Sequence, residues 1–161
     1  MNALGNGYEP APRAGNPLVL RRSSDLSGEL RALGLSFGDV VMVHASLRAI
    51  GPVEGGAAGV VRALEDAIGS AGTLLMNLGA RDEHDWASEH PGSQRVAPLD
   101  QAPAFNALTT PADPDVGVLA EVFRRLHGTV VNDHPDGRFG ARGRLARQLL
   151  APPLPWDDYY G

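Results

Sequence analysis

The chain has 161 residues, 43% of them hydrophobic, which suits a single domain with a real core. Its formal net charge of −5 disfavours nonspecific binding to nucleic acid, and the absence of cysteine excludes disulfides, thiolate-bound zinc and a cysteine acyl-enzyme. No apolar run approaches the roughly 20 residues of a membrane span, and residues 1–20 lack the order of a signal peptide, so we expect a cytoplasmic protein without membrane contact.

Residues 1–22 are rich in glycine and proline, and we expect them to form a disordered leader to one domain that spans residues 23–161. Ser24 then has the chemistry of a helix N-cap, and Gly34 is placed to end that helix. One face of the helix would carry three leucines: Leu26, Leu30 and Leu33.

The stretch from Gly38 to Gly59 predicts a strand, a glycine-rich turn and a helix. Val40 to Val43 is the short β-branched run of a buried strand. The glycines of the turn free the backbone to expose its N–H groups: Gly51, Gly55 and Gly56. Because the first N–H groups of a helix lack internal partners and the helix dipole is positive there, this junction suits an anion. An ordinary turn with nothing bound is the alternative.

Three side chains add donors at the carboxyl end of that strand, where open α/β sheets place their ligands: His44, Ser46 and Arg48. His44 suits contact with a cofactor and equally suits a core histidine bonded to a backbone carbonyl. Ser46 lacks the G-x-S-x-G elbow of a hydrolase nucleophile, which leaves hydrogen bonding as its expected role. Arg48 suits either a phosphate or full solvation.

The helix after Gly56 carries an apolar stripe that ends at Gly69. The stripe consists of Val60, Val61, Leu64, Ala67 and Ile68. A second strand follows at Leu74 to Leu78, and residues from about 80 to 112 show no period, which predicts a long loop. Four polar residues of this loop, at irregular spacing, suit a metal cluster or plain solvation: Asp82, His84, Asp85 and His90.

The last third of the chain predicts a helix, a strand and a final helix. Asp113 or Asp115 would cap the first of these helices, and Gly128 would stop it. Its apolar positions are Val118, Leu119, Val122, Phe123 and Leu126. A third short strand would span Thr129 to Val131, and Ala141 to Leu150 would form the last helix. Strands alternating with helices in this way predict an α/β fold, a mixed sheet flanked by helices.

Three blocks of the sequence follow recognisable patterns. The first, residues 38–51, matches G-D-x-x-x-V-H-x-S-L-x-x-x-G, and the second, residues 132–143, is similar to S-x-H-P-x-x-S-F-x-A-x-G. The third is W-D-D-Y-Y-G at residues 156–161. In this order, over roughly residues 24–161, the blocks resemble the antibiotic N-acetyltransferase family, the aminoglycoside 3-N-acetyltransferases.

The resemblance implies transfer of an acetyl group from acetyl-CoA to the 3-amino group of a 2-deoxystreptamine aminoglycoside, an antibiotic-resistance activity for which no metal is expected. It implies that acetyl-CoA is held by nine positions: His44, Ala45, Ser46, Leu47, Arg48, Gly51, Gly55, Gly56 and Thr73. It also makes two acidic residues of the long loop, Asp82 and Glu83, candidates for binding the cationic substrate.

His134 is the candidate catalytic residue. An alkylamine with a pKa of about 10 is mostly protonated at neutral pH, so a general base must take a proton as the nitrogen attacks the thioester. Histidine titrates closest to that pH. His134 lies just beyond the third predicted strand, before Pro135, where a solvated loop histidine is the alternative. The family's H-P motif implies the base role for it.

Members of the family continue beyond the third block, through a strand and a helix that bears an acidic partner for the histidine. The resemblance therefore implies a sheet that is incomplete relative to the family, with impaired activity and self-association through an exposed sheet edge. The alternative is a non-catalytic module that binds coenzyme A or pairs with another subunit.

Overall fold

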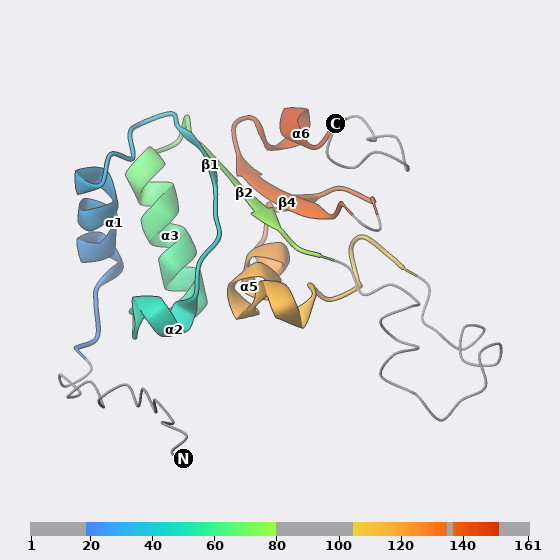
Figure 1. The fold of residues 1–161 in the computed structure, drawn as a ribbon. Helices are drawn as coiled ribbons and strands as arrows, with labels where there is room; N and C mark the ends of the chain where they lie inside the picture. Colours follow the sequence, from blue (N-terminus) through green and yellow to red (C-terminus); the bar gives the residue numbers. More distant parts are fainter. Residues whose placement is uncertain (1–18, 80–104, 135–136, 152–161) are drawn as a thin grey trace, which may run out of the picture.

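The computed structural model describes residues 19–79, 105–134 and 137–151. These residues form a mixed four-stranded sheet in the order β1-β2-β4-β3, flanked by helices (Figure 1). The predicted α/β architecture with a mixed sheet is therefore confirmed. Most of the predicted leader and of the long loop, together with the third sequence block, lies outside the described residues.

The first helix, α1, spans Ser23–Ala32 and begins one residue ahead of the predicted cap, Ser24. Arg22 occupies the N-cap position instead, and no side chain of the described residues caps the helix. Of the predicted leucines, Leu26 is buried, whereas Leu33 is 82% exposed because it lies at the C-cap, beyond the last helical turn. The helix packs along α3 (Figure 1).

Strand β1 comprises Val40–Met42 and forms one edge of the described sheet. It pairs in parallel with β2, and Val40 lies opposite Thr73, the first residue of β2. The prediction of a buried strand is wrong, because one face of this edge strand is open: Val40 is 50% and Met42 is 47% exposed. Val43, the residue after the strand, is buried in the core.

Two helices follow β1 where the sequence predicted one. The first, α2, is a single turn, Leu47–Ile50, and the second, α3, spans Gly56–Ile68. The predicted apolar stripe of α3 is confirmed, because all five of its residues are buried. The helix ends at Gly69, as predicted. It shares one core with side chains from α1, α5, β1 and β2.

Strand β2, Thr73–Asn77, is followed by a 3₁₀ turn, η2 (Pro114–Val116), and by helix α5 (Val118–Arg125). Asp113 caps η2 by accepting a hydrogen bond from Asp115 N–H. Because Gly117 has a φ of +91°, α5 begins only after it, and the predicted core residue Val118 is 68% exposed. No helix in the described part of the chain is long and apolar enough to cross a membrane.

The C-terminal part adds two strands and a short helix: β3 (Val130–Val131), β4 (Phe139–Gly143) and α6 (Ala146–Leu149). The predicted helix from Ala141 to Leu150 is wrong, because its first residues pair antiparallel with both β2 and β3. Close packing explains why position 140 of β4 is a glycine, since a Cβ there would lie 3.2 Å from both the Phe123 ring and Leu78. The described sheet therefore has four strands rather than three.

Candidate functional site

Three chain segments converge on one edge of the sheet. Because β1 and β2 are parallel, their carboxyl ends lie at the same edge. Strand β4 is antiparallel to β2 and begins opposite its end, with Phe139 paired to Asn77. The segments after β1, after β2 and before β4 therefore all lie at this edge, and the first two approach the start of α5 (Figure 1). This edge, called the carboxyl edge below, holds His44 and His134.

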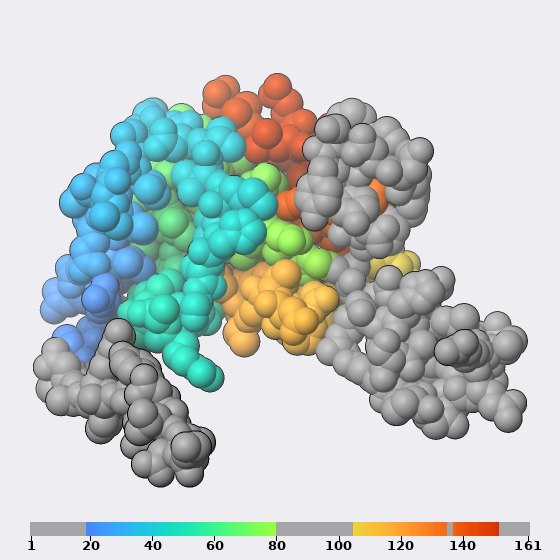
Figure 2. All heavy atoms as spheres, viewed as in Figure 1, coloured from blue at the N-terminus to red at the C-terminus, as the bar shows by residue number. Residues whose placement is uncertain are grey.

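A cavity of about 230 Å³ opens at the carboxyl edge. Its lining comes from the ends of β1 and β2 and from the η2–α5 region: Val43, His44, Ala45, Met76, Asn77, Asp115, Val116 and Leu119. On the face seen in Figure 2, the segment after β1 lies against the atoms of α5. Asp115 is the carboxylate of this lining, although its sequence context predicts only a helix cap. His44 is exposed, so the alternative that it is a core histidine is wrong.

Capping residues determine the conformation of the turn between α2 and α3. Ser46 is the N-cap of α2, and its hydroxyl accepts a hydrogen bond from Ala49 N–H at 3.4 Å. Gly51 ends α2 with a φ of +84°, and Gly55 caps α3 with a φ of +78°, both in the left-handed region that favours glycine. No side chain in the described segments caps α3, so its positive N-terminal end faces outward with Gly55 and Gly56 exposed.

The structure thus brings most of the predicted acetyl-CoA residues together. His44, Ala45 and Ser46 form the link from β1 to α2, and Leu47 and Arg48 belong to α2 itself. Arg48 is exposed. The three glycines of the turn complete the group: Gly51, Gly55 and Gly56.

Thr73 is the exception, because it lies at the other edge of the sheet. As the first residue of β2, it pairs with Val40 and Gly143. It is fully buried, and its Oγ1 accepts a hydrogen bond from Leu145 N–H at 3.0 Å. At about 3.3 Å per residue, the length of β1 separates it from His44 by roughly 13 Å. The geometry therefore groups Thr73 with a different set of residues.

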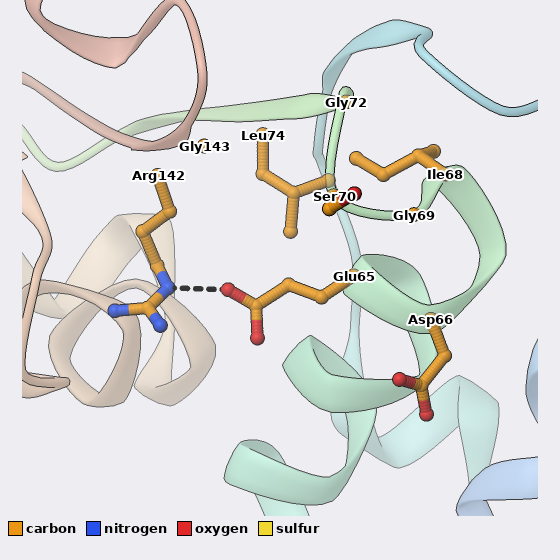
Figure 3. Close-up of a pocket in the computed structure, with 9 residues that line it drawn as sticks. All are labelled: Glu65, Asp66, Ile68, Gly69, Ser70, Gly72, Leu74, Arg142 and Gly143. Carbon is orange, nitrogen blue, oxygen red and sulfur yellow. Dashed lines mark hydrogen bonds and ion pairs between the residues drawn. The ribbon is translucent and has the colours of Figure 1, made fainter.

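The opposite edge of the sheet, at the amino ends of β1 and β2, is called the amino edge. It carries a second cavity, of about 380 Å³ (Figure 3). Its lining joins the end of α3 to the start of β2 and the end of β4: Glu65, Asp66, Ile68, Gly69, Ser70, Gly72, Leu74, Arg142 and Gly143. Glu65 accepts from Arg142 Nε at 2.8 Å, across the cavity wall in Figure 3. Arg142 also donates to the carbonyl of His127 at 2.7 Å and to Thr129 Oγ1 at 3.1 Å. The Arg142 side chain therefore links β4 to α3 and to the segment that follows α5.

His134 is held inside the turn that joins β3 to β4. Only 4% of its surface is exposed, and its Nδ1 accepts a hydrogen bond from Gly137 N–H at 2.8 Å. Asn132 closes the same turn: its amide donates to the Gly137 carbonyl at 2.9 Å and accepts from Phe139 N–H at 2.7 Å. Since Nδ1 offers its lone pair to Gly137, the neutral ring carries its proton on Nε2. The alternative of a solvated loop histidine is therefore wrong.

His134 and His44 both lie at the carboxyl edge of the sheet. Their segments leave β1 and the β3–β4 turn, which lie two to three strand positions apart in the sheet order. At about 4.8 Å per strand, this is a separation of roughly 10 to 15 Å. Such a span suits one extended ligand that reaches from the α2–α3 turn to the imidazole.

Two residues of this region carry no functional signal in the sequence. Arg138 follows His134 closely and is completely buried, and burial lowers its pKa to about 10. Glu121 on α5 has a pKa lowered to about 2, chiefly by its hydrogen bond from Arg124 and also by one from Ala112 N–H. Arg138 belongs to the second sequence block, but a charged residue gives no sequence signal of burial.

The predicted substrate residues Asp82 and Glu83 lie outside the described residues. The other members of the loop cluster considered for metal, His84, Asp85 and His90, lie outside them as well. Across residues 19–79, 105–134 and 137–151, no three His, Cys, Asp or Glu side chains gather as metal ligands.

Comparison with known proteins adds sequence relatives. Residues 42–161 match the family model described as Aminoglycoside 3-N-acetyltransferase. The chain is 39% identical over 150 residues to Aminoglycoside N(3)-acetyltransferase VIII of Streptomyces fradiae, covering 92% of this chain and 51% of the relative. It is 37% identical over 154 residues to Aminoglycoside N(3)-acetyltransferase VII of Streptomyces paromomycinus, with the same two coverages, 92% and 51%. The chain spans about half the length of these curated relatives.

Solved structures of similar fold agree with the sequence relatives. AAC-IIIb, solved as a binary complex with CoASH, superposes with a TM-score of 0.75 at 29% identity, over 85% of this chain and 51% of that one. AAC-VIa with sisomicin bound superposes with a TM-score of 0.72 at 35% identity, over 84% of this chain and 51% of that one.

Proposed function

The chain belongs to the aminoglycoside 3-N-acetyltransferase family, and from this premise we propose that it transfers an acetyl group from acetyl-CoA to the 3-amino group of a 2-deoxystreptamine aminoglycoside. Such a reaction inactivates the antibiotic and would confer resistance. The observation that carries the proposal is the convergence of His134 and the α2–α3 turn on the carboxyl edge of the sheet. Relatives solved with CoASH and with sisomicin support the two substrates.

The α2–α3 turn fits the anionic part of acetyl-CoA. The N-terminus of α3, a helix of 13 residues, presents backbone N–H groups and the positive end of its dipole. The exposed Arg48 adds a guanidinium close by, and Ser46 adds a hydroxyl. We propose that these groups bind phosphate oxygens, while the thioester end reaches toward His134. Thr73, at the amino edge, stands apart from this arrangement.

The cationic substrate would enter between the histidines. The cavity beside His44 offers the Asp115 carboxylate, and the net charge of −5 attracts a polycation at long range. We propose that Asp82 and Glu83 of the long loop bind further amino groups, as the resemblance implies.

In the proposed reaction, the 3-amino nitrogen attacks the thioester carbonyl carbon. The new N–C bond forms as the C–S bond breaks, the amine gives up a proton and the leaving sulfur takes one. His134 is the proposed carrier of that proton. Its described tautomer has the lone pair on Nδ1, directed at Gly137 N–H. To accept a proton on Nε2, the ring must first hold its proton on Nδ1, and an acceptor must then replace Gly137 N–H.

That requirement favours a second candidate function, a non-catalytic module that binds coenzyme A or pairs with another subunit. In the described geometry His134 serves the turn rather than a substrate. The enzyme and a module that binds coenzyme A differ in turnover alone, because both keep the α2–α3 turn as a coenzyme A site, whereas a module that only pairs with another subunit needs neither.

The test measures thiol release from acetyl-CoA in the presence and absence of a 2-deoxystreptamine aminoglycoside, with His134→Gln as the matched variant. The proposed enzyme releases thiol only with the aminoglycoside, and the variant does not. Coenzyme A binding by calorimetry without any turnover would replace the enzyme by the binding module. Thiol release that ignores the acceptor would contradict both.

A further inference from the structure

Arg138 is the most deeply buried charge among the described residues, with no part of its surface exposed. Its guanidinium donates to three backbone carbonyls of one segment: Ala107 at 2.7 Å, Thr110 at 2.5 Å and Pro111 at 2.9 Å. The ring centroid of Phe105 lies 5.5 Å from Cζ, within the range of a cation–π contact. Nε is buried and finds no acceptor among the described residues.

Holding this cation in the interior is costly. A buried charge needs a carboxylate or a full set of hydrogen bonds, and the hydrogen-bond acceptors of Arg138 among the described residues are all backbone carbonyls. Burial lowers its pKa to about 10, with a smaller contribution from the positive charge of Arg124. An apolar side chain of similar length would fill the same volume without this cost. The presence of a guanidinium at this position is therefore explained by the chain segment that its N–H groups hold in place, and not by a gain in stability.

What it holds is the segment of residues 105–113, which leads from the long loop to η2. A second arginine anchors the same segment from α5: Arg124 donates to the Leu108 carbonyl at 2.5 Å. Glu121 accepts from Ala112 N–H at 2.8 Å and binds Arg124 with both carboxylate oxygens. The segment is thus a fixed platform, and Arg138 joins it to β4.

The backbone of Arg138 connects this platform to the candidate catalytic residue. Its carbonyl accepts from Leu78 N–H at 2.9 Å, at the end of β2. The preceding residue is Gly137, whose N–H donates to His134 Nδ1. A shift of Arg138 therefore reaches the imidazole through a single peptide unit.

We propose that Arg138 is a positioning residue that ties the His134 turn to residues 107–111, and thereby fixes the position of the imidazole at the carboxyl edge. The inference deepens the proposed function and rests on it for its effect on turnover. Arg138 itself touches neither substrate; it acts through Gly137 and His134.

The experiment compares three variants of the full chain. Arg138→Met keeps the length of the side chain and removes all its donors, while Arg138→Lys keeps the charge and part of the hydrogen bonding. Arg142→Met is the matched control, because Arg142 is also a largely buried arginine of the β4 segment that donates to backbone carbonyls, but at the amino edge.

Two readouts separate positioning from a merely structural role. The first needs no activity: it is the exchange of the Gly137 amide with solvent and the nitrogen chemical shifts of the His134 ring, which report the hydrogen bond between them. We expect Arg138→Met to speed exchange of the Gly137 amide roughly tenfold or more and to change the nitrogen chemical shifts of the His134 ring, because the ring loses its fixed position. Arg138→Lys should lie between it and the wild type, and Arg142→Met should match the wild type in both.

The second readout is kinetic. Misplacement of a reacting group by about 1 Å can cost on the order of a hundredfold in rate, so we expect kcat to fall toward that extent in Arg138→Met while KM for acetyl-CoA stays within about twofold. Arg138→Lys should restore part of kcat. Arg142→Met should lower the melting temperature and leave kcat unchanged at a temperature where it is folded.

The outcomes are distinct. If folded Arg138→Met keeps wild-type exchange at Gly137 and the wild-type ring shifts, the positioning role is overturned, whatever the kinetics show. If the methionine variant does not fold, the lysine variant decides in the same way, and ring shifts identical to wild type overturn the proposal. A wild-type chain without turnover contradicts the proposed enzyme and leaves the NMR comparison to decide on Arg138.

Discussion

The two edges of the sheet differ in the polar groups that they leave exposed. At the amino edge, Glu65, Arg142 and Thr73 are bound to protein partners that join helices to strands. At the carboxyl edge, the exposed His44 lines a cavity, and the α2–α3 turn offers helix N–H groups without a side-chain cap in the described segments. Both edges have cavities of several hundred cubic ångströms, so volume does not distinguish them. The exposed His44 and the N-terminus of α3, which no described side chain caps, do distinguish them, and they support our proposal that the chemistry takes place at the carboxyl edge.

The largest effect we expect comes from His134. His134→Ala should lower turnover by roughly a hundredfold or more, because general base catalysis contributes that much in the transition state. Calorimetry should find coenzyme A affinity unchanged, since the imidazole lies away from the α2–α3 turn. A variant with wild-type turnover would break the comparison at once, by removing the chemistry from the carboxyl edge.

The next effect concerns the α2–α3 turn. In Gly55→Val a β-branched residue meets a φ of +78°, and its Cβ would lie 3.1 Å from Arg62 Nη2. We expect coenzyme A affinity to fall by roughly tenfold, or about 1.4 kcal/mol. Gly34→Val is the matched control, because its φ is +113° and no described heavy atom lies within 4 Å of the added Cβ. Equal affinity in both variants and the wild type would refute the turn as the binding site.

A smaller effect tests the amino edge. Thr73→Val removes the acceptor of Leu145 N–H, and we expect a loss of about 1 kcal/mol in the free energy of unfolding. Coenzyme A affinity should not change, since Thr73 is fully buried at the opposite edge. A stable variant with weakened coenzyme A binding would show that Thr73 belongs to the coenzyme A site and that the two edges are not functionally distinct.

The smallest effect is a pH dependence on the platform beside the carboxyl edge. Hydrogen bonds from Arg124 and Ala112 lower the pKa of Glu121 from 4.5 to about 2. A lowered carboxyl pKa stabilises the fold fully above the unfolded value and loses this contribution as the pH falls through the folded one. Because the pair is partly exposed, we expect Glu121→Gln to cost about 0.5 kcal/mol at neutral pH.

Denaturant unfolding across pH checks this prediction. The stability difference between wild type and Glu121→Gln should be constant above pH 4.5 and shrink as the pH falls toward about 2. A difference that persists at the acid end would show that Glu121 supports the 105–113 segment by packing rather than by charge.

The sequence predicted those parts of the fold that carry a period or a stop signal. The apolar stripe of α3 and its end at Gly69 are confirmed. Both could be predicted because helical spacing and a helix-ending glycine are local features of the sequence. Strand β4 was missed, since its sequence, F-G-A-R-G, has neither alternation nor β-branched residues. It forms a strand because two neighbours pair with it, which is information that no local window holds.

The candidate site was predictable to the same degree. His44 and the turn glycines stand in one stretch of chain, so their proximity follows from the sequence. The position of Thr73 depends on strand register, and the role of Arg138 depends on a segment about 30 residues earlier in the chain, as its contacts with Ala107 and Pro111 show. Burial of a cation is the opposite of what its residue type predicts.

Chemical-shift mapping of coenzyme A on the isotope-labelled full chain tests the central claim most directly, because it needs neither turnover nor a substitution. We expect the backbone signals of residues 44–56 and of Gly137 to move on titration, while those of Glu65, Thr73 and Arg142 stay in place. Shifts gathered at the amino edge, with the α2–α3 turn unchanged, would contradict the assignment of the proposed chemistry to the carboxyl edge.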